Sequence, residues 1–314
     1  MNPEHTQYTH LFGPVPSRRL GRSLGVDIVP FKVCSLNCIY CQLGPTTTLT
    51  TQRRPYVAAA DVIEELRRWL DSGGSADYIT LSGSGEPTLN SELDQIIEFV
   101  QQHTEIPMAL LTNGTLLGDP QVRAQVSGLD LLIPSLDAAT DAAFERVNRP
   151  AEGLDAEGLI EGIAAAREQC AGQTWLEVML VQGINDSDEE LSAIRRAVER
   201  IRPHRVQINT VVRPPAEPDA RALSPAELAH ARDMLGPLTE IVAPLPEDYS
   251  GDLDHQQTAE AVFDLLRRRP CTINDIALGL SIHPNEATKY VQALLAEEHV
   301  EPLQKAGSVY YKAV

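Results

Sequence analysis

Long hydrophobic runs are missing from this chain. No stretch of about 18 consecutive apolar residues, the length that crosses a bilayer, occurs in the 314 residues. The first ten residues are polar and contain no apolar segment of the kind found in a signal peptide. We therefore expect no membrane span and no secretory signal, and we predict a cytoplasmic protein.

Positive charge is scarce, with 26 Lys and Arg against 44 Asp and Glu, a net charge of −18. The balance is uneven along the chain. Residues 1–60 carry six basic and two acidic side chains, residues 61–254 fourteen and thirty-five, and residues 255–314 six and seven. A broad acidic body argues against a large nucleic-acid footprint, which needs many Lys and Arg contacts to phosphates. We expect most of the acidic side chains on solvated helix faces.

Cysteine is scarce too, with five in the chain. Three of them fall within eight residues, where they cannot all pair with one another, and the other two are isolated. A disulfide framework is therefore not expected. We call residues 34–41 the cysteine loop; it holds Cys34, Cys38 and Cys41, and the isolated residues are Cys170 and Cys271.

The cysteine loop indicates a metal centre. A structural zinc site usually has a fourth protein ligand close by, and the nearest histidines in the sequence are His10 and His103. Soft thiolates also bind iron–sulfur clusters. A cubane held by three thiolates leaves one iron open to a further ligand. The pattern therefore favours a reactive cluster over structural zinc.

The spacing Cys-x3-Cys-x2-Cys, with Tyr40 just before the last cysteine, resembles the signature of the radical S-adenosylmethionine (SAM) superfamily. Further similar motifs follow in order along most of the first 250 residues: Gly85-Glu86-Pro87, Thr112-Asn113-Gly114, Ser135-Leu136-Asp137 and Gly183-Ile184-Asn185-Asp186. Residues 12–25 are similar to one subgroup, the iron–sulfur oxidoreductases related to tRNA wyosine synthetases.

The resemblance implies two cofactors, a [4Fe–4S] cluster and SAM. Cys34, Cys38 and Cys41 would hold three irons, and the open iron would chelate SAM. Reductive cleavage of SAM would release a 5′-deoxyadenosyl radical, which abstracts hydrogen from a substrate. The electron donor would be a protein such as flavodoxin or ferredoxin. The protein itself contributes binding, orientation and electrostatics.

The resemblance also places SAM contacts at the ends of successive strands. Glu86 would accept from the SAM ammonium, and polar groups on the next two strands would meet the ribose hydroxyls and the methionyl group. Ser84 stands where the family has glycine. By themselves, Asn-Gly indicates a turn, and either Asp137 or Thr140 is suited to cap the following helix. The expected cofactor-binding residues are Tyr40, Gly85, Glu86, Pro87, Asn113, Ser135 and Asp137.

Weaker candidates follow on later strands, and no catalytic residue is assigned. Gly183-Ile184, after the fifth predicted strand, resembles the adenine-side motif of the family, and Glu177 is expected to face the barrel interior. Three residues at the end of the sixth predicted strand are candidates for substrate contact: Asn209, Thr210 and Arg213.

Apolar strand-like runs alternate with helical patterns, which predicts an α/β fold with six βα units and a parallel sheet. The pattern leaves an open sheet and a partly closed barrel as alternatives, and the resemblance implies the partial (β/α)6 barrel. Either places the site at the carboxyl ends of the strands. The predicted strands are 24–29, 78–81, 108–111, 129–134, 175–181 and 205–212.

The stretch before the first predicted strand, residues 12–25, is rich in glycine and proline and predicts a loop. Arg18, Arg19 and Arg22 lie in it, close in sequence to the cysteine loop. Their guanidinium groups are suited to an anionic substrate, or alternatively to acidic groups of the barrel rim.

We predict three parts of the chain: a radical SAM barrel over residues 1–243, a linker over 244–254, and a winged helix-turn-helix domain over 255–314. In the last part, helices are expected at 255–269, 272–280 and 284–297, followed by a two-stranded wing over 304–314. The third helix offers only Lys289 against Glu286, Glu297 and the adjoining Glu298. A module that docks protein or peptide, or a plain structural cap, is therefore favoured over DNA binding.

The leading hypothesis is a radical SAM enzyme whose substrate is a tRNA base, a peptide or protein, or a small anionic metabolite. The alternative is a transcriptional regulator that senses redox state through an iron–sulfur cluster and uses the winged helix to read DNA. That alternative leaves Gly85-Glu86-Pro87 and Ser135-Leu136-Asp137 without a task.

Overall fold

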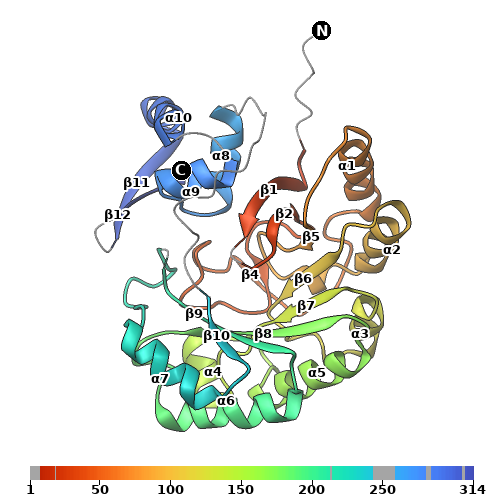
Figure 1. The fold of residues 1–314 in the computed structure, drawn as a ribbon, viewed down its shortest axis with the longest axis vertical. Coiled ribbons are helices and arrows are strands. Elements are labelled where there is room, and N and C mark those ends of the chain that lie inside the picture. The colour runs from red at the N-terminus through yellow and green to blue at the C-terminus, as the bar shows by residue number, and fades with distance from the viewer. Residues whose placement is uncertain (1–7, 18, 213, 243–258, 281–283, 306–307) are drawn as a thin grey trace.

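The computed structural model describes residues 8–17, 19–212, 214–242, 259–280, 284–305 and 308–314. One large sheet dominates the described chain, with helices wrapped around its outer side (Figure 1). The strands run in the order β1 (Leu11–Ser17), β2 (Gly21–Val26), β5 (Tyr78–Leu81), β6 (Met108–Thr112), β7 (Leu131–Pro134), β8 (Gln173–Leu180), β9 (Arg205–Thr210) and β10 (Thr239–Ile241).

From β2 to β10 every neighbouring pair of strands is parallel, so the predicted α/β class is confirmed. Because each crossover returns the chain to the same end of the sheet, the carboxyl ends of these strands share one edge. The helices between them are α1 (Ala59–Asp71), α2 (Leu93–His103), α3 (Pro120–Val126), α4 (Asp141–Val147), α5 (Ala156–Gln169), α6 (Asp188–Ile201) and α7 (Pro225–Leu235).

The main core lies between the sheet and these helices. Alternate side chains of β8 and β9, such as Val178 and Ile208, are fully buried there against apolar helix faces. Several helices begin at a side-chain cap, the fullest being the capping box of Ser224 and Glu227 at the start of α7. The opposite faces of β8 and β9 carry polar side chains, including Glu177 and Asn209, toward the inside of the curved sheet.

The prediction of a loop over residues 12–25 is wrong. The structure has an antiparallel hairpin there, β1 paired with β2, and the register shifts between Phe12 and Val15. Strand β1 is at the edge of the sheet. Because proline has no N–H to donate to a neighbouring strand, sheets accept prolines such as Pro14 and Pro16 mainly on edge strands. With β10 at the other edge, the sheet has eight strands and not six. β10 has three residues, too few to produce a periodic pattern.

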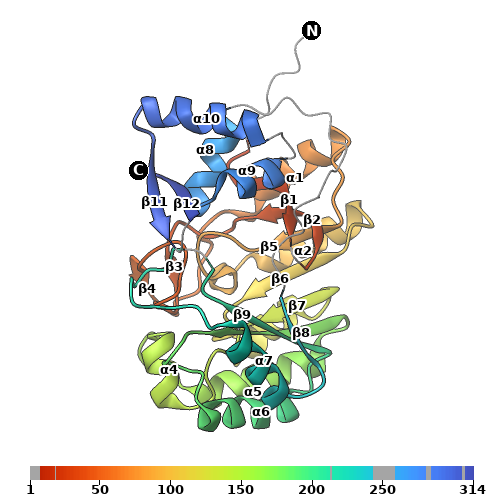
Figure 2. The same cartoon turned by 60° about the vertical axis from the view of Figure 1, so that its left-hand side comes forward.

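The C-terminal part of the described chain contains α8 (Ala259–Arg268), α9 (Ile273–Leu280), α10 (Pro284–Ala296) and an antiparallel hairpin of β11 (Val300–Lys305) and β12 (Ser308–Ala313). These elements share a hydrophobic cluster of their own, and Val15 of β1 packs against it. Figure 2 shows them beside β1 and β2. The division into domains stays a prediction, and the predicted linker lies outside the described residues.

Among the described residues, no helix combines the length and the apolar character needed to cross a bilayer.

Candidate active site

The cysteine loop lies just beyond the carboxyl end of β2. Its first turn belongs to the short parallel pair β3 (Val33–Cys34) and β4 (Thr48–Leu49). The amide of Cys41 donates to the carbonyl of Cys38 at 3.1 Å, which forms a tight turn between the last two thiols. All three cysteines are half-buried. The loop is therefore a fixed part of the fold at the edge where the family resemblance predicts the site.

Each thiol of the loop has its own nitrogen donor. Asn113 Nδ2 lies 3.5 Å from Cys34 Sγ, and Asn148 Nδ2 lies 3.3 Å from Cys38 Sγ. Lys32 Nζ lies 3.0 Å from Cys41 Sγ. Such outer donors orient sulfur ligands and stabilise their negative charge. Sequence reasoning missed Lys32 and Asn148 in this role.

Burial raises the pKa of the Cys34 thiol to about 12, with the charge of Glu86 adding to the effect. The pKa of Cys38 is raised for the same reason, with Asp137 adding to it. Both thiols also interact electrostatically with Cys41. Because neighbouring thiolates repel one another, a bound metal cation such as iron would favour deprotonation of Cys34 and Cys38. The donor set thus suits a sulfur-ligated cluster.

In the part of the chain that the structure describes, no three His, Cys, Asp or Glu side chains approach closely enough to hold a single metal ion. The thiolates of a cubane bind separate iron atoms at separate corners. The distances between these side chains therefore argue against a single bound ion such as zinc but are compatible with a cluster.

The loop after β5 packs directly on the cysteine loop. A Cβ placed on Gly85 would lie 2.0 Å from the carbonyl oxygen of Val33, so only glycine fits there. The amide of Glu86 donates to that same oxygen at 3.0 Å, and the amide of Lys32 donates to the carbonyl of Ser84 at 2.6 Å. The two predicted motifs are therefore held together backbone to backbone.

The carboxylate of Glu86 is buried, with 2% of the residue exposed. It accepts hydrogen bonds from the amide and hydroxyl of Thr88, at 3.0 and 2.5 Å, from the hydroxyl of Thr112 at 2.6 Å, and from the amide of Asn113 at 2.7 Å. Burial raises the pKa of Glu86 while these hydrogen bonds oppose the rise. Glu86 thus joins the short 3₁₀ turn η1 (Pro87–Leu89) to the end of β6.

Asp137, also 2% exposed, joins the cysteine loop to two strands. The Tyr40 hydroxyl and Asn148 Nδ2 donate to one carboxylate oxygen, the latter at 2.7 Å, and the amide of Met179 donates to the other at 2.9 Å. Burial raises the pKa of Asp137 to about 6, with the hydrogen bond from Tyr40 acting in the opposite direction. Of the two residues considered as a cap for the following helix, Thr140 caps α4 and Asp137 does not.

Asn113 and Ser135 follow β6 and β7 at the same edge. Asn113 Nδ2 donates to the Ser35 hydroxyl at 2.9 Å, and its Oδ1 accepts from the amide of Thr115 at 3.0 Å. Ser135 is half-buried, and its backbone pairs with Thr112 and Glu177. Its hydroxyl has no hydrogen-bond partner among the described residues. Ser135 is therefore the predicted SAM contact best placed to bond a ligand.

Inside the sheet, Glu177 of β8 forms an ion pair with Arg19, which belongs to the β1–β2 connection. Asn209 Nδ2 of β9 lies 3.5 Å from the other Glu177 oxygen. The predicted interior position of Glu177 therefore coincides with one of the arginines noted in the sequence. Arg18 and Arg213 lie outside the described residues. Thr210 donates to the carbonyl of Leu180 at 2.9 Å, a contact between neighbouring strands.

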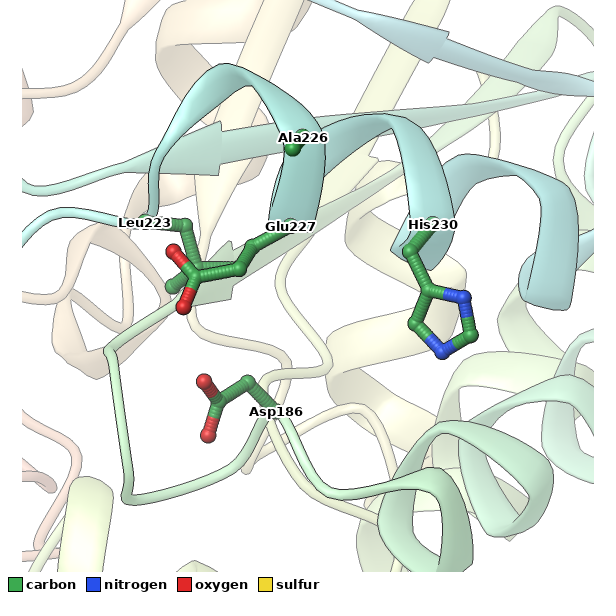
Figure 3. A pocket seen from close by; sticks show the side chains of 5 residues that line it. All are labelled: Asp186, Leu223, Ala226, Glu227 and His230. Carbon is green, nitrogen blue, oxygen red and sulfur yellow. The ribbon is translucent and has the colours of Figure 1, made fainter.

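A separate hollow of about 300 Å³ lies between the β8–α6 connection and α7. Figure 3 shows Asp186 and Glu227 extending into the same space, with His230 to one side. Glu227 is committed to the cap of α7 and accepts from Gln182 at 3.0 Å, and His230 pairs with Asp188 at 2.7 Å. None of the cysteine-loop residues lines this hollow. Of its polar groups, Glu227 caps α7 and His230 of α7 pairs with Asp188 of α6.

Known proteins resemble this chain in sequence over most of its length. It is 37% identical over 287 residues to the GTPase Obg of Brachyspira hyodysenteriae, covering 91% of this chain and 42% of that protein. It thus spans less than half of that relative. It is 31% identical to a UPF0026 protein of Helicobacter pylori, with 96% of each chain covered.

A solved structure shares the fold. The radical SAM methyltransferase from Sphaerobacter thermophilus aligns with a TM-score of 0.53 at 18% identity, covering 73% of this chain and 68% of that chain. A family model described as the radical SAM superfamily matches residues 28–194, which include the cysteine loop and the strands up to β8. Enzymes of this superfamily use a [4Fe–4S] cluster and SAM. With this match over more than half of its length, the chain belongs to the radical SAM superfamily of enzymes.

Proposed function

We propose that Cys34, Cys38 and Cys41 hold a [4Fe–4S] cluster and that this chain abstracts hydrogen from a substrate by SAM-dependent radical chemistry. The observation that carries the proposal is the cysteine loop itself. Three thiols lie at the carboxyl edge of a parallel sheet, each facing its own nitrogen donor. When bound, the reduced cluster supplies the electron that cleaves SAM to methionine and a 5′-deoxyadenosyl radical.

The chain's own residues would bind and orient SAM. The Ser135 hydroxyl, which follows β7 at the same edge of the sheet, would donate to or accept from a polar group of SAM, and Gly85 and Pro87 would line the site through their backbone. Asn113 would contribute through its amide, while Glu86 and Asp137 keep these loops in position through the hydrogen bonds described above. Tyr40, whose hydroxyl donates to Asp137, would fix the far end of the cysteine loop.

Substrate candidates remain the three classes given by the sequence. Arg19 is paired with Glu177, so its charge is already balanced within the sheet. A small anionic metabolite therefore gains less from this arginine than the sequence suggested. The distant relationship to tRNA wyosine synthetases stays a hypothesis about the subgroup, and the acidic body does not favour a large tRNA contact.

Radical SAM enzymes need a reductant such as flavodoxin or ferredoxin. For the C-terminal part, three helices followed by an antiparallel hairpin support the winged-helix hypothesis, and we propose that it docks a protein or peptide. The reported relatives give no support to the alternative of a redox-sensing regulator. The cytoplasmic location stays a prediction.

Anaerobic reconstitution tests the proposal. The protein is loaded with iron and sulfide, reduced with dithionite and mixed with SAM, and 5′-deoxyadenosine is measured by chromatography. We expect cluster absorption and 5′-deoxyadenosine from the native chain. Cys38→Ala should lose both, because it removes one ligand of the cluster.

Cys170→Ser is the matched control. Cys170 is half-buried at the end of α5, and its thiol lies 3.6 Å from the carbonyl oxygen of Leu129, away from the cysteine loop. This variant should retain both the cluster and SAM cleavage. Loss of the cluster from Cys170→Ser, or its retention in Cys38→Ala, would contradict the ligand assignment.

A further inference from the structure

Lys32 is an unusual lysine in this chain. The sequence has four lysines, Lys32, Lys289, Lys305 and Lys312. Lysine side chains are rarely buried, yet only 3% of Lys32 is exposed. Its ammonium lies 3.0 Å from Cys41 Sγ. Nowhere in the described chain does a carboxylate form an ion pair with Lys32. A positive charge is thus placed against a sulfur and not against an acid.

The backbone fixes this lysine on both sides. Lys32 has a positive φ of 59°, a conformation that costs energy for a residue with a side chain. Its amide donates to the carbonyl of Ser84 at 2.6 Å, and its carbonyl accepts from the amides of Thr47 and Thr48, both at 3.2 Å. These bonds hold the strained conformation. The fixed backbone of Lys32 therefore restricts where its ammonium group can lie.

A buried cation beside a sulfur ligand changes the redox balance of a cluster. Reduction adds one electron and hence one negative charge to the cluster. A nearby positive charge in a poorly solvated site favours the more negative state. Hydrogen bonds to the sulfurs act in the same direction. Asn113 and Asn148 supply neutral donors to the other two thiols, so Lys32 is the charged member of the set.

We infer that Lys32 raises the reduction potential of the cluster and thereby makes it reducible by its electron donor. This inference rests on the proposed cluster at Cys34, Cys38 and Cys41. Lys32 is a positioning residue that acts through Cys41 and needs no contact with SAM. The electron comes from the reductant, enters the cluster alone, and no proton has to move.

The test compares reconstituted native protein with K32M, K32Q and K32R. K32M removes the charge and the donor at similar length, K32Q keeps a neutral donor, and K32R keeps the charge. K312M is the control, because Lys312 is paired with Glu301 at 2.7 Å on the exposed C-terminal hairpin. Iron and sulfide content is measured first. The midpoint potential is then measured, without SAM, by titration followed with EPR of the reduced cluster.

We expect full iron and sulfide content in every variant. In K32M the ratio of reduced to oxidised cluster at a fixed potential should fall about tenfold, which corresponds to about 59 mV for a one-electron couple. K32Q should show a smaller fall, and K32R and K312M should match the native protein.

A fully loaded K32M with the native midpoint would overturn the inference. Loss of the cluster from both K32M and K32Q would also overturn it, because Lys32 would then be required for assembly and would not set the potential. Failure of the native chain to form any cluster is a different result, which would sink the proposed function itself.

Discussion

Asp137 is a buried acid that joins the cysteine loop to strand β8. Its carboxylate is buried, and burial raises its pKa to about 6 from an ordinary value of 3.8. In the unfolded chain the group loses its proton at the lower pH. Between about pH 4 and pH 6 the folded apoprotein therefore binds a proton that the unfolded chain has released.

From this group, the free energy of unfolding should fall as pH rises from about 4 to about 6, by about 3 kcal/mol in all. Above pH 6 the carboxylate is charged in both states and the penalty stays constant. Asp137→Asn has no such titration, so its stability should change less over this range. Denaturant unfolding of the cluster-free protein at several pH values measures the slope.

Asp71→Asn, on the exposed end of α1, is the control for this pH series. It should follow the native curve. If Asp137→Asn keeps the full native slope, another group is responsible and the assignment to Asp137 is incorrect.

The sequence could identify the cysteines but not their donors. Cys34, Cys38 and Cys41 are recognisable because chemistry fixes their spacing within one loop. Asn148 is 110 residues from Cys38 in sequence and meets it only because the turn after α4 packs on the cysteine loop. Lys32 gave a weak signal, because it stands two residues before the first cysteine in a chain with only four lysines among its 26 basic residues.

Among the elements, the loop from Ser82 to Pro87 requires a glycine at position 85 to pack on the cysteine loop. Gly85→Ala would bring a Cβ against the backbone carbonyl of Val33, where no side chain can move aside. Either the Ser82–Pro87 loop moves away from the cysteine loop, or the backbone around Gly85 and Val33 becomes strained. We expect a loss of about 1–3 kcal/mol in stability, as for other overpacked sites, together with a lower iron content after reconstitution.

Gly118→Ala provides the comparison, because a Cβ there meets no atom within 4 Å. It should retain native stability and iron content. Equal behaviour of the two variants, measured by thermal unfolding and iron analysis, would show that the contact of Gly85 with Val33 is unimportant.

The elements that the sequence predicted well are those with long periodic patterns. Strands β8 and β9 begin and end within two residues of their expected ranges. Strand β1 was missed because its prolines indicate a loop unless the strand is known to be an edge. That knowledge comes only from the order of strands in the sheet, to which residues distant in sequence contribute.

On the scale of the whole molecule, the C-terminal elements contact Asp27, which in turn accepts hydrogen bonds from the loop that packs on the cysteine loop. Arg268 of α8 donates to Asp27 at 3.2 Å and stacks over the Phe12 ring at 4.1 Å. Asp27 also accepts from the amide of Ser84 at 3.1 Å and from its hydroxyl. The sequence could not predict this link, because Arg268 stands in a run of three arginines that looks like an ordinary basic helix end.

Arg268→Gln should therefore weaken both the packing of the C-terminal elements and the Ser84 loop. The ion pair is largely shielded, with 20% of the Arg268 side chain and 11% of the Asp27 side chain exposed. Its loss leaves Asp27 buried with only the Ser84 donors, so we expect a cost of about 1–3 kcal/mol. Arg267→Gln is the matched control, since Arg267 is exposed and lies 3.9 Å from Asp264 on the same helix.

Thermal unfolding and limited proteolysis should distinguish the two variants, with faster cleavage and a lower melting temperature for Arg268→Gln alone. If both variants behave like the native chain, the contact does not join the C-terminal elements to the sheet in solution. If Arg268→Gln also binds SAM more weakly, the C-terminal elements support the cofactor site through Asp27 and Ser84.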